Sequence, residues 1–359
     1  MIIAYSLILC LLSLYSYSLV DPNITLFSSP LWIGLREWAV RLGYYHRDWS
    51  FAIFALLVVS VFLFHRYFVH RVKLEPIKIA LIIGLILLFS YPFLSHDFFN
   101  YLFDAKIVTF YHQNPYIMKA LDFPLDPWIR FMHWTHRTYP YGPVFLLISL
   151  VPSALSLGKF IADYFLFKLL FLGAYLISVY LLSRMKKIYG LIFATHPLVI
   201  FEGLINNHND MIAIVIAIYG LYQLKQNKNK LYGTITIFIS SAVKYLSMPF
   251  VLLSFEDKRR NYAAVILFSA MMVYFLLFKE LQPWYFLNLF ILLPFFARTL
   301  ESSWLFMFGL LMSYYPFIRF GEWLKIGDIP MKHFIIATFF LVNVCYLLAR
   351  GTILKKKDI

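Results

Sequence analysis

The sequence predicts an all-α, polytopic helical membrane protein. Of its 359 residues, 62% are hydrophobic, 20% are aromatic and only 14% are charged, and the mean hydropathy is +0.74. A soluble domain of this size could not bury so much apolar surface. The apolar runs are too long for barrel strands, and backbone groups in lipid must be satisfied within the protein. The spans are therefore expected to be helices.

About twelve apolar segments follow one another along the chain. They cover residues 2–20, 51–69, 76–95, 143–157, 159–183, 188–205, 209–224, 231–255, 261–278, 284–298, 303–319 and 331–349. Residues 2–20 lack a basic leading region and a clear cleavage site, so we expect a retained first helix. The pattern predicts about 11–13 transmembrane segments, with residues 1–359 forming a single transmembrane domain.

The run 143–157 is expected to lie along the membrane interface instead of crossing. It is short and carries Pro152 in its middle. Without a crossing here, the basic stretch 184–187 falls on the cytoplasmic side, as the positive-inside rule requires. Residues 96–158 then form a large outer loop with juxtamembrane helices, and residues 206–210 lie on the same outer side.

The run 231–255 is expected to form two short helices in a V. A reversal near residues 244–249 returns the charged stretch 256–260 to the cytoplasmic side. A single helix through the whole run is the alternative, and it would place that stretch outside.

The net charge of +14 has two interpretations. It is typical of a nucleic-acid-binding protein, but it is also what cytoplasmic loops near anionic lipid require. We favour the second and expect membrane lipid, not nucleic acid, as a partner. The two cysteines, Cys10 and Cys345, both lie in apolar runs, so no disulfide framework is implied.

The unusual polar residues gather on the predicted outer side. Asp97 directly follows an apolar run, and Asp97, Tyr101 and Asp104 have the spacing of one helical face. We expect that helix to end near Asn114, because Pro115 disfavours helical geometry at the preceding residue.

Further along the chain come Arg137, the turn 139–143, the polar stretch 206–210 and Lys244. Ionisable residues at membrane depth are costly, so a functional site is the first hypothesis. Structural alternatives stay open for several of these residues. Asp97 is also suited to complement a helix dipole, and His208 is suited to cap a helix. Lys244 is long enough to reach the lipid headgroups. Aromatic residues at the membrane interface are common, and Tyr139, Tyr141 and Trp284 fit that role. The spacing of His133, His136 and His208 predicts no metal site.

These motifs together resemble the GT-C superfamily of membrane glycosyltransferases, especially polytopic mannosyltransferases that use a polyprenyl-phosphate sugar. The resemblance spans roughly residues 80–300. It is carried by "D…Y…DAK…NPY" from Asp97, then "YPYGPVF", "HPLVIFEGLINNHND", "AVKY" and "PWY". Where some relatives carry a paired acidic motif, this chain has His96 and Asp97.

The resemblance implies an inverting glycosyltransferase acting at the outer face of the plasma membrane. Asp97 would be the catalytic base that accepts the proton of the acceptor hydroxyl. Lys244 and Arg137 would bind the donor phosphate, because fixed positive charge stabilises the leaving phosphate. The residues expected to bind sugar or acceptor are His96, Tyr101, Asp104, Asn114, Tyr141, Asn207, His208, Asp210 and Trp284.

The partners expected from this reading are a polyprenyl-phosphate sugar donor, most suitably of mannose, and a glycan or lipid-linked acceptor. No cofactor is expected. Three other functions stay open: a transporter or flippase of a lipid-linked sugar, a polysaccharide polymerase, and a structural or assembly subunit. A transporter is expected to show pseudo-symmetric halves and broken helices near the midplane, and the sequence shows no internal repeat.

Overall fold

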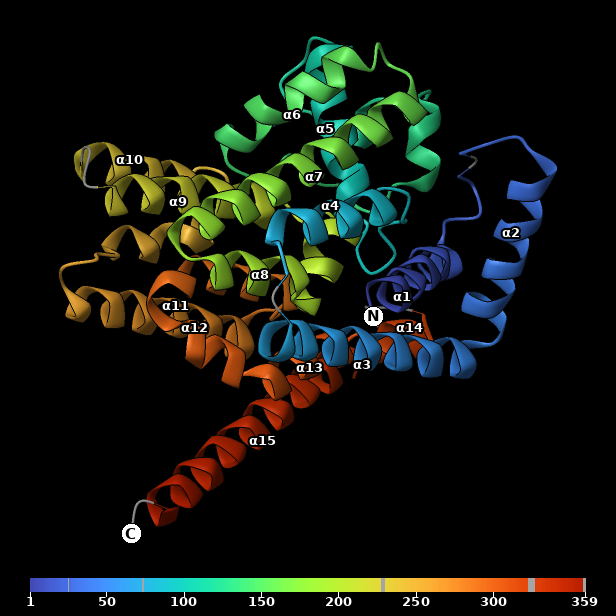
Figure 1. The fold of residues 1–359 in the computed structure, drawn as a ribbon. Coiled ribbons are helices and arrows are strands. Elements are labelled where there is room, and N and C mark those ends of the chain that lie inside the picture. The colour runs from blue at the N-terminus through green and yellow to red at the C-terminus, as the bar shows by residue number, and fades with distance from the viewer. Residues whose placement is uncertain (25, 73, 227–229, 322–326, 358–359) are drawn as a thin grey trace.

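The all-α class is confirmed. The structure is a computed structural model that describes residues 1–24, 26–72, 74–226, 230–321 and 327–357. It is 78% helical and has no strand among these residues. Figure 1 shows the helices gathered into one body, with the C-terminal helix α15 extending away from it.

The α-helices are α1 (Ile2–Tyr15), α2 (Pro30–Val40), α3 (Arg47–Arg71), α4 (Pro76–Leu87), α5 (Asp97–Thr109), α6 (Pro143–Leu155), α7 (Phe160–Met185), α8 (Lys187–Thr195), α9 (Asp210–Lys225), α10 (Lys230–Ser241), α11 (Lys258–Phe278), α12 (Leu293–Ser302), α13 (Trp304–Met312), α14 (Tyr315–Phe320) and α15 (Asp328–Lys357). The 3-10 helices are η1 (Ser16–Leu19), η3 (Ala120–Asp122), η4 (Pro127–Phe131), η6 (Tyr245–Leu252) and η7 (Pro283–Leu292), and the π-helices are η2 (Arg41–Tyr45) and η5 (Val199–Ile205).

Fewer helices than the sequence suggested are long enough to cross a membrane unaided. Within the described ranges, six meet that length and hydropathy, and a seventh appears if the bent pair α8–η5 counts as one span. The six are Ile2–Leu19, Arg47–Arg71, Phe160–Met185, Lys258–Phe278, Pro283–Ser302 and Ile329–Arg350. Other apolar runs form shorter helices, such as α4 with 12 residues and α9 with 16.

Proline accounts for several of these interruptions. The run 76–95 leaves the helix at Leu87, shortly before Pro92. The run 188–205 breaks at His196, directly before Pro197, and its two parts, α8 and η5, are bent by 71°. A residue before proline is pushed toward extended backbone, so an apolar run containing proline need not be one straight helix.

The run 231–255 forms two short helices, as expected. The helix α10 ends at Ser241 and η6 begins at Tyr245, and the two pack against each other. The Ser240 hydroxyl donates to the Ser247 hydroxyl across the bend, at 2.9 Å. The bend carries Lys244 toward the polar stretch at residues 206–210.

The predicted outer loop, residues 96–158, contains α5, η3, η4 and α6. The helix α6 is a separate helix of 13 residues that packs against α5 and α7, and α5 ends at Thr109, before Pro115 as expected. Figure 1 shows α5 and α6 side by side at the top of the molecule. Inside this region the Lys106 ammonium donates to the Asp126 carboxylate at 2.5 Å.

The helix α2 was not anticipated from the apolar runs. It begins at Pro30 after an N-cap, Ser29, whose side chain accepts a hydrogen bond from the Trp32 backbone N–H. A serine followed by proline at the first helical position is a helix-start signal.

Candidate active site

Asp97 is the first residue of α5, and its backbone N–H donates to the Ser95 hydroxyl at 3.3 Å. Its side chain is 19% exposed. This position allows the carboxylate to interact favourably with the helix dipole and still reach a ligand from solvent.

The polar stretch Asn206–Asp210 lies directly behind Asp97 and is buried throughout. It follows the π-helix η5, and Asn207 has a positive φ of 55°, which asparagine tolerates better than most residues. Lys168 of α7 fixes the turn: its ammonium donates to the Leu204 and Ile205 carbonyls and to Asn207 Oδ1, the last at 2.9 Å. Five consecutive polar residues are thus held inside the protein.

His208 lies between two carboxylates. Its Nδ1 is 3.9 Å from Asp97 Oδ2, and its Nε2 is 3.4 Å from Glu202 Oε2. Both distances exceed the length of a good hydrogen bond, but each ring nitrogen faces an oxygen of a carboxyl group. The ring stacks on Trp284, with centroids 4.0 Å apart and planes 13° apart. Trp284 therefore fixes the plane in which His208 meets Asp97.

A second polar group centres on Asp210, the first residue of α9. The Lys244 ammonium donates to Asp210 Oδ2 at 2.6 Å and to Asn209 Oδ1 at 3.4 Å. The Asn288 amide donates to Asp210 Oδ1 at 2.7 Å. Asn209 connects this group to α5, the helix of Asp97, because its backbone N–H donates to the Tyr101 hydroxyl at 3.4 Å.

His96, beside Asp97, stacks on His133 with centroids 3.5 Å apart. Burial, reinforced by the neighbouring His133, lowers the pKa of His96 to about 3. His96 is therefore neutral at physiological pH, and its ring can offer a hydrogen bond to a ligand without adding charge next to Asp97.

Most of the residues expected from the sequence meet in this region. Tyr141 packs on Tyr101, with ring centroids 5.2 Å apart. Asp104 lies deeper on α5 and is 4% exposed. Burial, and secondly the charge of Asp97, raises the pKa of Asp104 well above its ordinary value. Asp104 is thus suited to stay protonated, unlike a catalytic base.

Two expected residues lie apart from the buried group. Asn114 is exposed, and its side chain accepts a hydrogen bond from the Tyr116 backbone N–H in a local turn. Arg137 is exposed and lies over the Trp134 ring, 4.2 Å from its centroid. The loop of Arg137 nevertheless covers the start of α5, because the Asn100 amide donates to the Trp134 carbonyl at 3.3 Å.

The sequence reading missed Glu202, Lys168, Asn288 and Lys332. Glu202 and Lys168 sit inside apolar runs, where an ionisable residue is itself a signal of function or of a buried partner. Lys332 is buried, donates to Glu280 at 2.8 Å and to Gln282, and lies 6.0 Å from the centroid of the Trp284 ring. It helps to anchor the segment that carries Trp284.

The described residues contain no candidate metal site: no group of three or more His, Cys, Asp or Glu side chains is arranged to hold an ion. The expectation of a reaction without metal stays a prediction.

The fold and the site together define a polytopic helical membrane protein with a buried polar cluster around one accessible carboxylate. The chain belongs to the MptA/B family, whose model, described as "Alpha-(1->6)-mannopyranosyltransferase, N-terminal domain", matches residues 29–255. This confirms the resemblance to membrane mannosyltransferases.

One curated relative supports this membership. Alpha-(1->6)-mannopyranosyltransferase A of Mycobacterium tuberculosis (strain ATCC 25618 / H37Rv) is 27% identical over 200 residues, which cover 51% of this chain and 38% of the relative. The match therefore spans well under two thirds of the relative's length. No solved structure matches the chain.

Proposed function

We propose that the protein is an inverting glycosyltransferase. It moves mannose from a polyprenyl-phosphate donor to a glycan or lipid-linked acceptor at the outer face of the plasma membrane. The observation that carries the proposal is Asp97: its side chain is 19% exposed, whereas His208, Glu202 and Asp210 behind it are fully buried. Membership of a family named for mannosyl transfer supports the choice of sugar.

Asp97 acts as the general base. The acceptor hydroxyl attacks the anomeric carbon, the sugar–phosphate bond breaks, and the hydroxyl proton passes to Asp97. His208 and Glu202 lie next to the carboxylate, at the distances given above, and orient it toward the acceptor hydroxyl. Asp97 loses its negative charge when it accepts the proton, and the negative charge that develops is on the departing phosphate.

The leaving group is a phosphate, which needs a cation more than a proton. Lys244 is the first candidate, because an ammonium has three donors and the contacts to Asp210 and Asn209 use two of them. Its side chain is 11% exposed, so a ligand can reach the third. Arg137 supplies a second cation from the exposed loop over α5.

The sugar hydroxyls find donors and acceptors next to this cation. Two buried polar atoms, Asn209 Nδ2 and Asn288 Oδ1, have no hydrogen-bond partner within the described part of the chain. A buried group left without a partner costs about 1–3 kcal/mol. Both atoms belong to side chains that contact the Lys244–Asp210 pair, and a bound sugar would satisfy them.

The name of the relative suggests an α-(1→6) product. An inverting transfer that forms an α linkage requires a donor whose sugar–phosphate bond is β. The stereochemistry can therefore be tested by offering the α- and β-anomers of polyprenyl-phosphate mannose separately. An α-linked product from the β-donor, identified by NMR, supports inversion; an α-linked product from the α-donor contradicts it.

The decisive experiment uses purified full-length protein in liposomes with labelled polyprenyl-phosphate mannose and candidate acceptors, with products followed by mass. Asp97→Asn should abolish detectable transfer while donor binding persists, since loss of a general base costs about 10²–10⁴ in rate. Asp104→Asn, the control on the same helix, should retain measurable activity. Near wild-type transfer by Asp97→Asn would overturn the assignment of the base. Movement of donor across the bilayer without transfer would favour the flippase instead.

A further inference from the structure

A large cavity lies beside the start of α8, and no residue of the Asp97 cluster lines it. Its volume is about 1280 Å³, and its walls come from α3, α8, α12, α13 and α15. The helix α8 links the two sites: residues at its start line this cavity, and the chain that continues through η5 reaches Asn206 at the candidate active site. The cavity is therefore separate from the proposed catalytic machinery.

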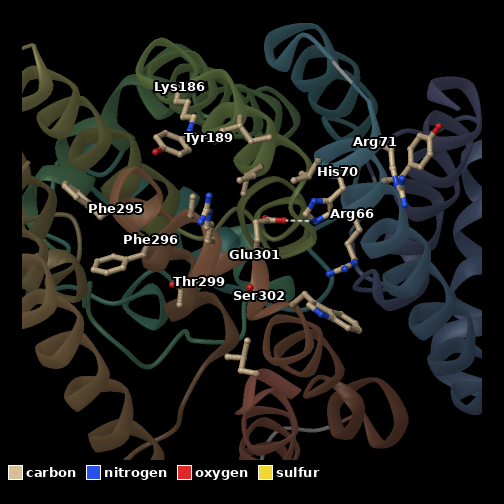
Figure 2. Close-up of a pocket in the computed structure, with 18 of the residues that line it drawn as sticks. Arg66, His70, Arg71, Lys186, Tyr189, Phe295, Phe296, Thr299, Glu301 and Ser302 are labelled. Carbon is tan, nitrogen blue, oxygen red and sulfur yellow. Dashed lines mark ion pairs between the residues drawn. The ribbon is translucent and has the colours of Figure 1, made fainter. Parts of the chain in front are cut away.

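The cavity is strongly basic. Five lysine or arginine side chains line it, against one carboxylate, Glu301. The cations are Arg66, Arg71, Lys186, Arg298 and Arg350. Figure 2 shows Arg66, Arg71 and Lys186 among the side chains that line the cavity, with Glu301 turned toward His70.

Glu301 offsets only part of this charge, through its electrostatic interaction with Arg66. Its two oxygens face His65 Nε2 at 3.2 Å and His70 Nε2 at 4.0 Å. No carboxylate of the described residues lies within ion-pair distance of any of the five cations. Their mutual repulsion costs free energy that a bound anion would recover.

The rest of the lining suits an amphiphilic ligand. Phe295, Phe296, Trp304 and Leu347 place apolar surface beside the arginines. Arginine presents a planar fork of donors that matches phosphate oxygens in pairs. On the predicted topology the cavity opens to the cytoplasmic leaflet, where anionic lipids are concentrated.

We propose that this cavity binds a phosphate-bearing anion, independently of the transfer reaction. The phosphate comes either from the headgroup of an anionic phospholipid or from a soluble phosphate compound. Arg71 and Arg298 hold it from α3 and α12, on two different walls of the cavity. Both are exposed and lie outside the ion pairs given above, so replacing them should leave the fold intact.

The test compares two matched double variants of the full-length protein in neutral detergent. Arg71→Gln with Arg298→Gln removes two charges from the cavity. Arg259→Gln with Arg260→Gln removes two charges from exposed positions at the start of α11, outside the cavity. Native mass spectrometry measures retention of phosphatidylglycerol, with phosphatidylcholine as the uncharged comparison. Isothermal titration calorimetry measures inorganic phosphate and pyrophosphate, and thermal denaturation confirms that both variants are folded.

The cavity variant should lose at least about tenfold in affinity for the phosphate-bearing probe, because two charge-assisted contacts disappear. The control variant should bind as the wild type does. Selective loss with phosphatidylglycerol identifies a lipid headgroup, and selective loss with phosphate or pyrophosphate identifies a soluble ligand. Equal binding of all probes by both variants, or an equal loss in both, would overturn the proposal, since the first leaves no role for the cavity and the second reflects net charge alone.

Discussion

At the residue scale, His208 is the side chain that would hold the Asp97 carboxylate in place for the proposed catalysis. The imidazole faces Asp97 on one side and Glu202 on the other, and Trp284 fixes the plane of its ring. A carboxylate–imidazole–carboxylate row orients the outermost member at little entropic cost, since the inner two are buried and immobile. On the proposed function, Glu202 is a positioning residue that acts on Asp97 through His208.

Glu202→Gln should lower kcat by roughly 10- to 100-fold, the usual loss when the partner that orients a functional side chain is removed, and leave KM for the donor nearly unchanged. The pH dependence of kcat should also shift, because the charge behind His208 is gone. Steady-state kinetics across pH would measure both effects. Glu256→Gln is the matched control: Glu256 is exposed, and its ion pair within the described part of the chain is with Lys230, which is also exposed. Unchanged kcat and pH profile in Glu202→Gln would remove Glu202 from the mechanism.

Asp104 yields a prediction about stability. Its pKa is raised from an ordinary value of 3.8, chiefly by burial, so the folded state binds its proton more tightly than the unfolded state does. The stability from protonated Asp104 is complete below pH 3.8 and is lost as pH rises toward the folded-state pKa. Asp104→Asn mimics the protonated acid and escapes this loss. Thermal denaturation between pH 4 and 8 should show that the stability of the variant relative to the wild type increases as pH rises. A difference in stability that does not change with pH would contradict the raised pKa.

At the scale of elements, two backbone hydrogen bonds join the start of α6 to the bend that carries Lys244. The Gly142 backbone N–H donates to the Val243 carbonyl and the Val144 N–H to the Ala242 carbonyl, each at 3.2 Å. The approach is so close that a Cβ on Gly142 would lie 1.9 Å from the Ala242 oxygen. Glycine is thus required where the outer loop meets this bend.

Gly142→Ala should destabilise the protein by about 1–3 kcal/mol, the usual cost of forcing an extra carbon into a packed site, and should reduce transfer by displacing Lys244. Gly173→Ala provides the comparison, because a Cβ there meets nothing within 4 Å and alanine favours helix over glycine. Thermal inactivation of the two variants would measure the difference. Equal stability would mean that the backbone at Ala242 moves freely.

Sequence patterns predicted the class and most of the apolar helices, because hydropathy reports directly on burial in lipid. They also located Asp97, the polar stretch 206–210 and Lys244, whose charge conflicts with their surroundings. They could not show that Glu202 approaches His208, since that contact depends on the π-helical turn between them. Nor could they separate Arg137 and Asn114 from the buried group, because exposure of a loop side chain is set by tertiary packing.

At the scale of the whole molecule, polar residues collect in two separate places. Residues at the start of α8 line the basic cavity, and the chain that continues through η5 reaches the Asp97 cluster. This separation matches the predicted topology, in which the Asp97 cluster faces outward and the basic cavity faces the cytoplasm. The match supports that orientation as a proposal, since positive charge is retained on the cytoplasmic side.

Labelling with a membrane-impermeant thiol reagent on intact cells would test the orientation. After replacement of Cys10 and Cys345, a cysteine at Gln113 should react from outside, and one at Lys186 should react only after permeabilisation. Both native side chains are exposed, so access is limited by the membrane alone. Reaction of position 186 in intact cells would reverse the orientation and place the proposed chemistry in the cytoplasm.

The π-helical geometry of η5 determines the direction in which the side chains directly after it point. Here the Asn206 N–H bonds to the Phe201 carbonyl, five residues back, and the His208 N–H to the Glu202 carbonyl. An α-helix turns by about 100° per residue, so the extra residue in a π turn swings the next side chains by that angle. Removing one apolar residue from η5 would leave the segment mostly apolar. It would nevertheless rotate His208 away from Asp97. The helical geometry of this mostly apolar turn therefore decides where His208 points, and the hydropathy of the turn does not show it.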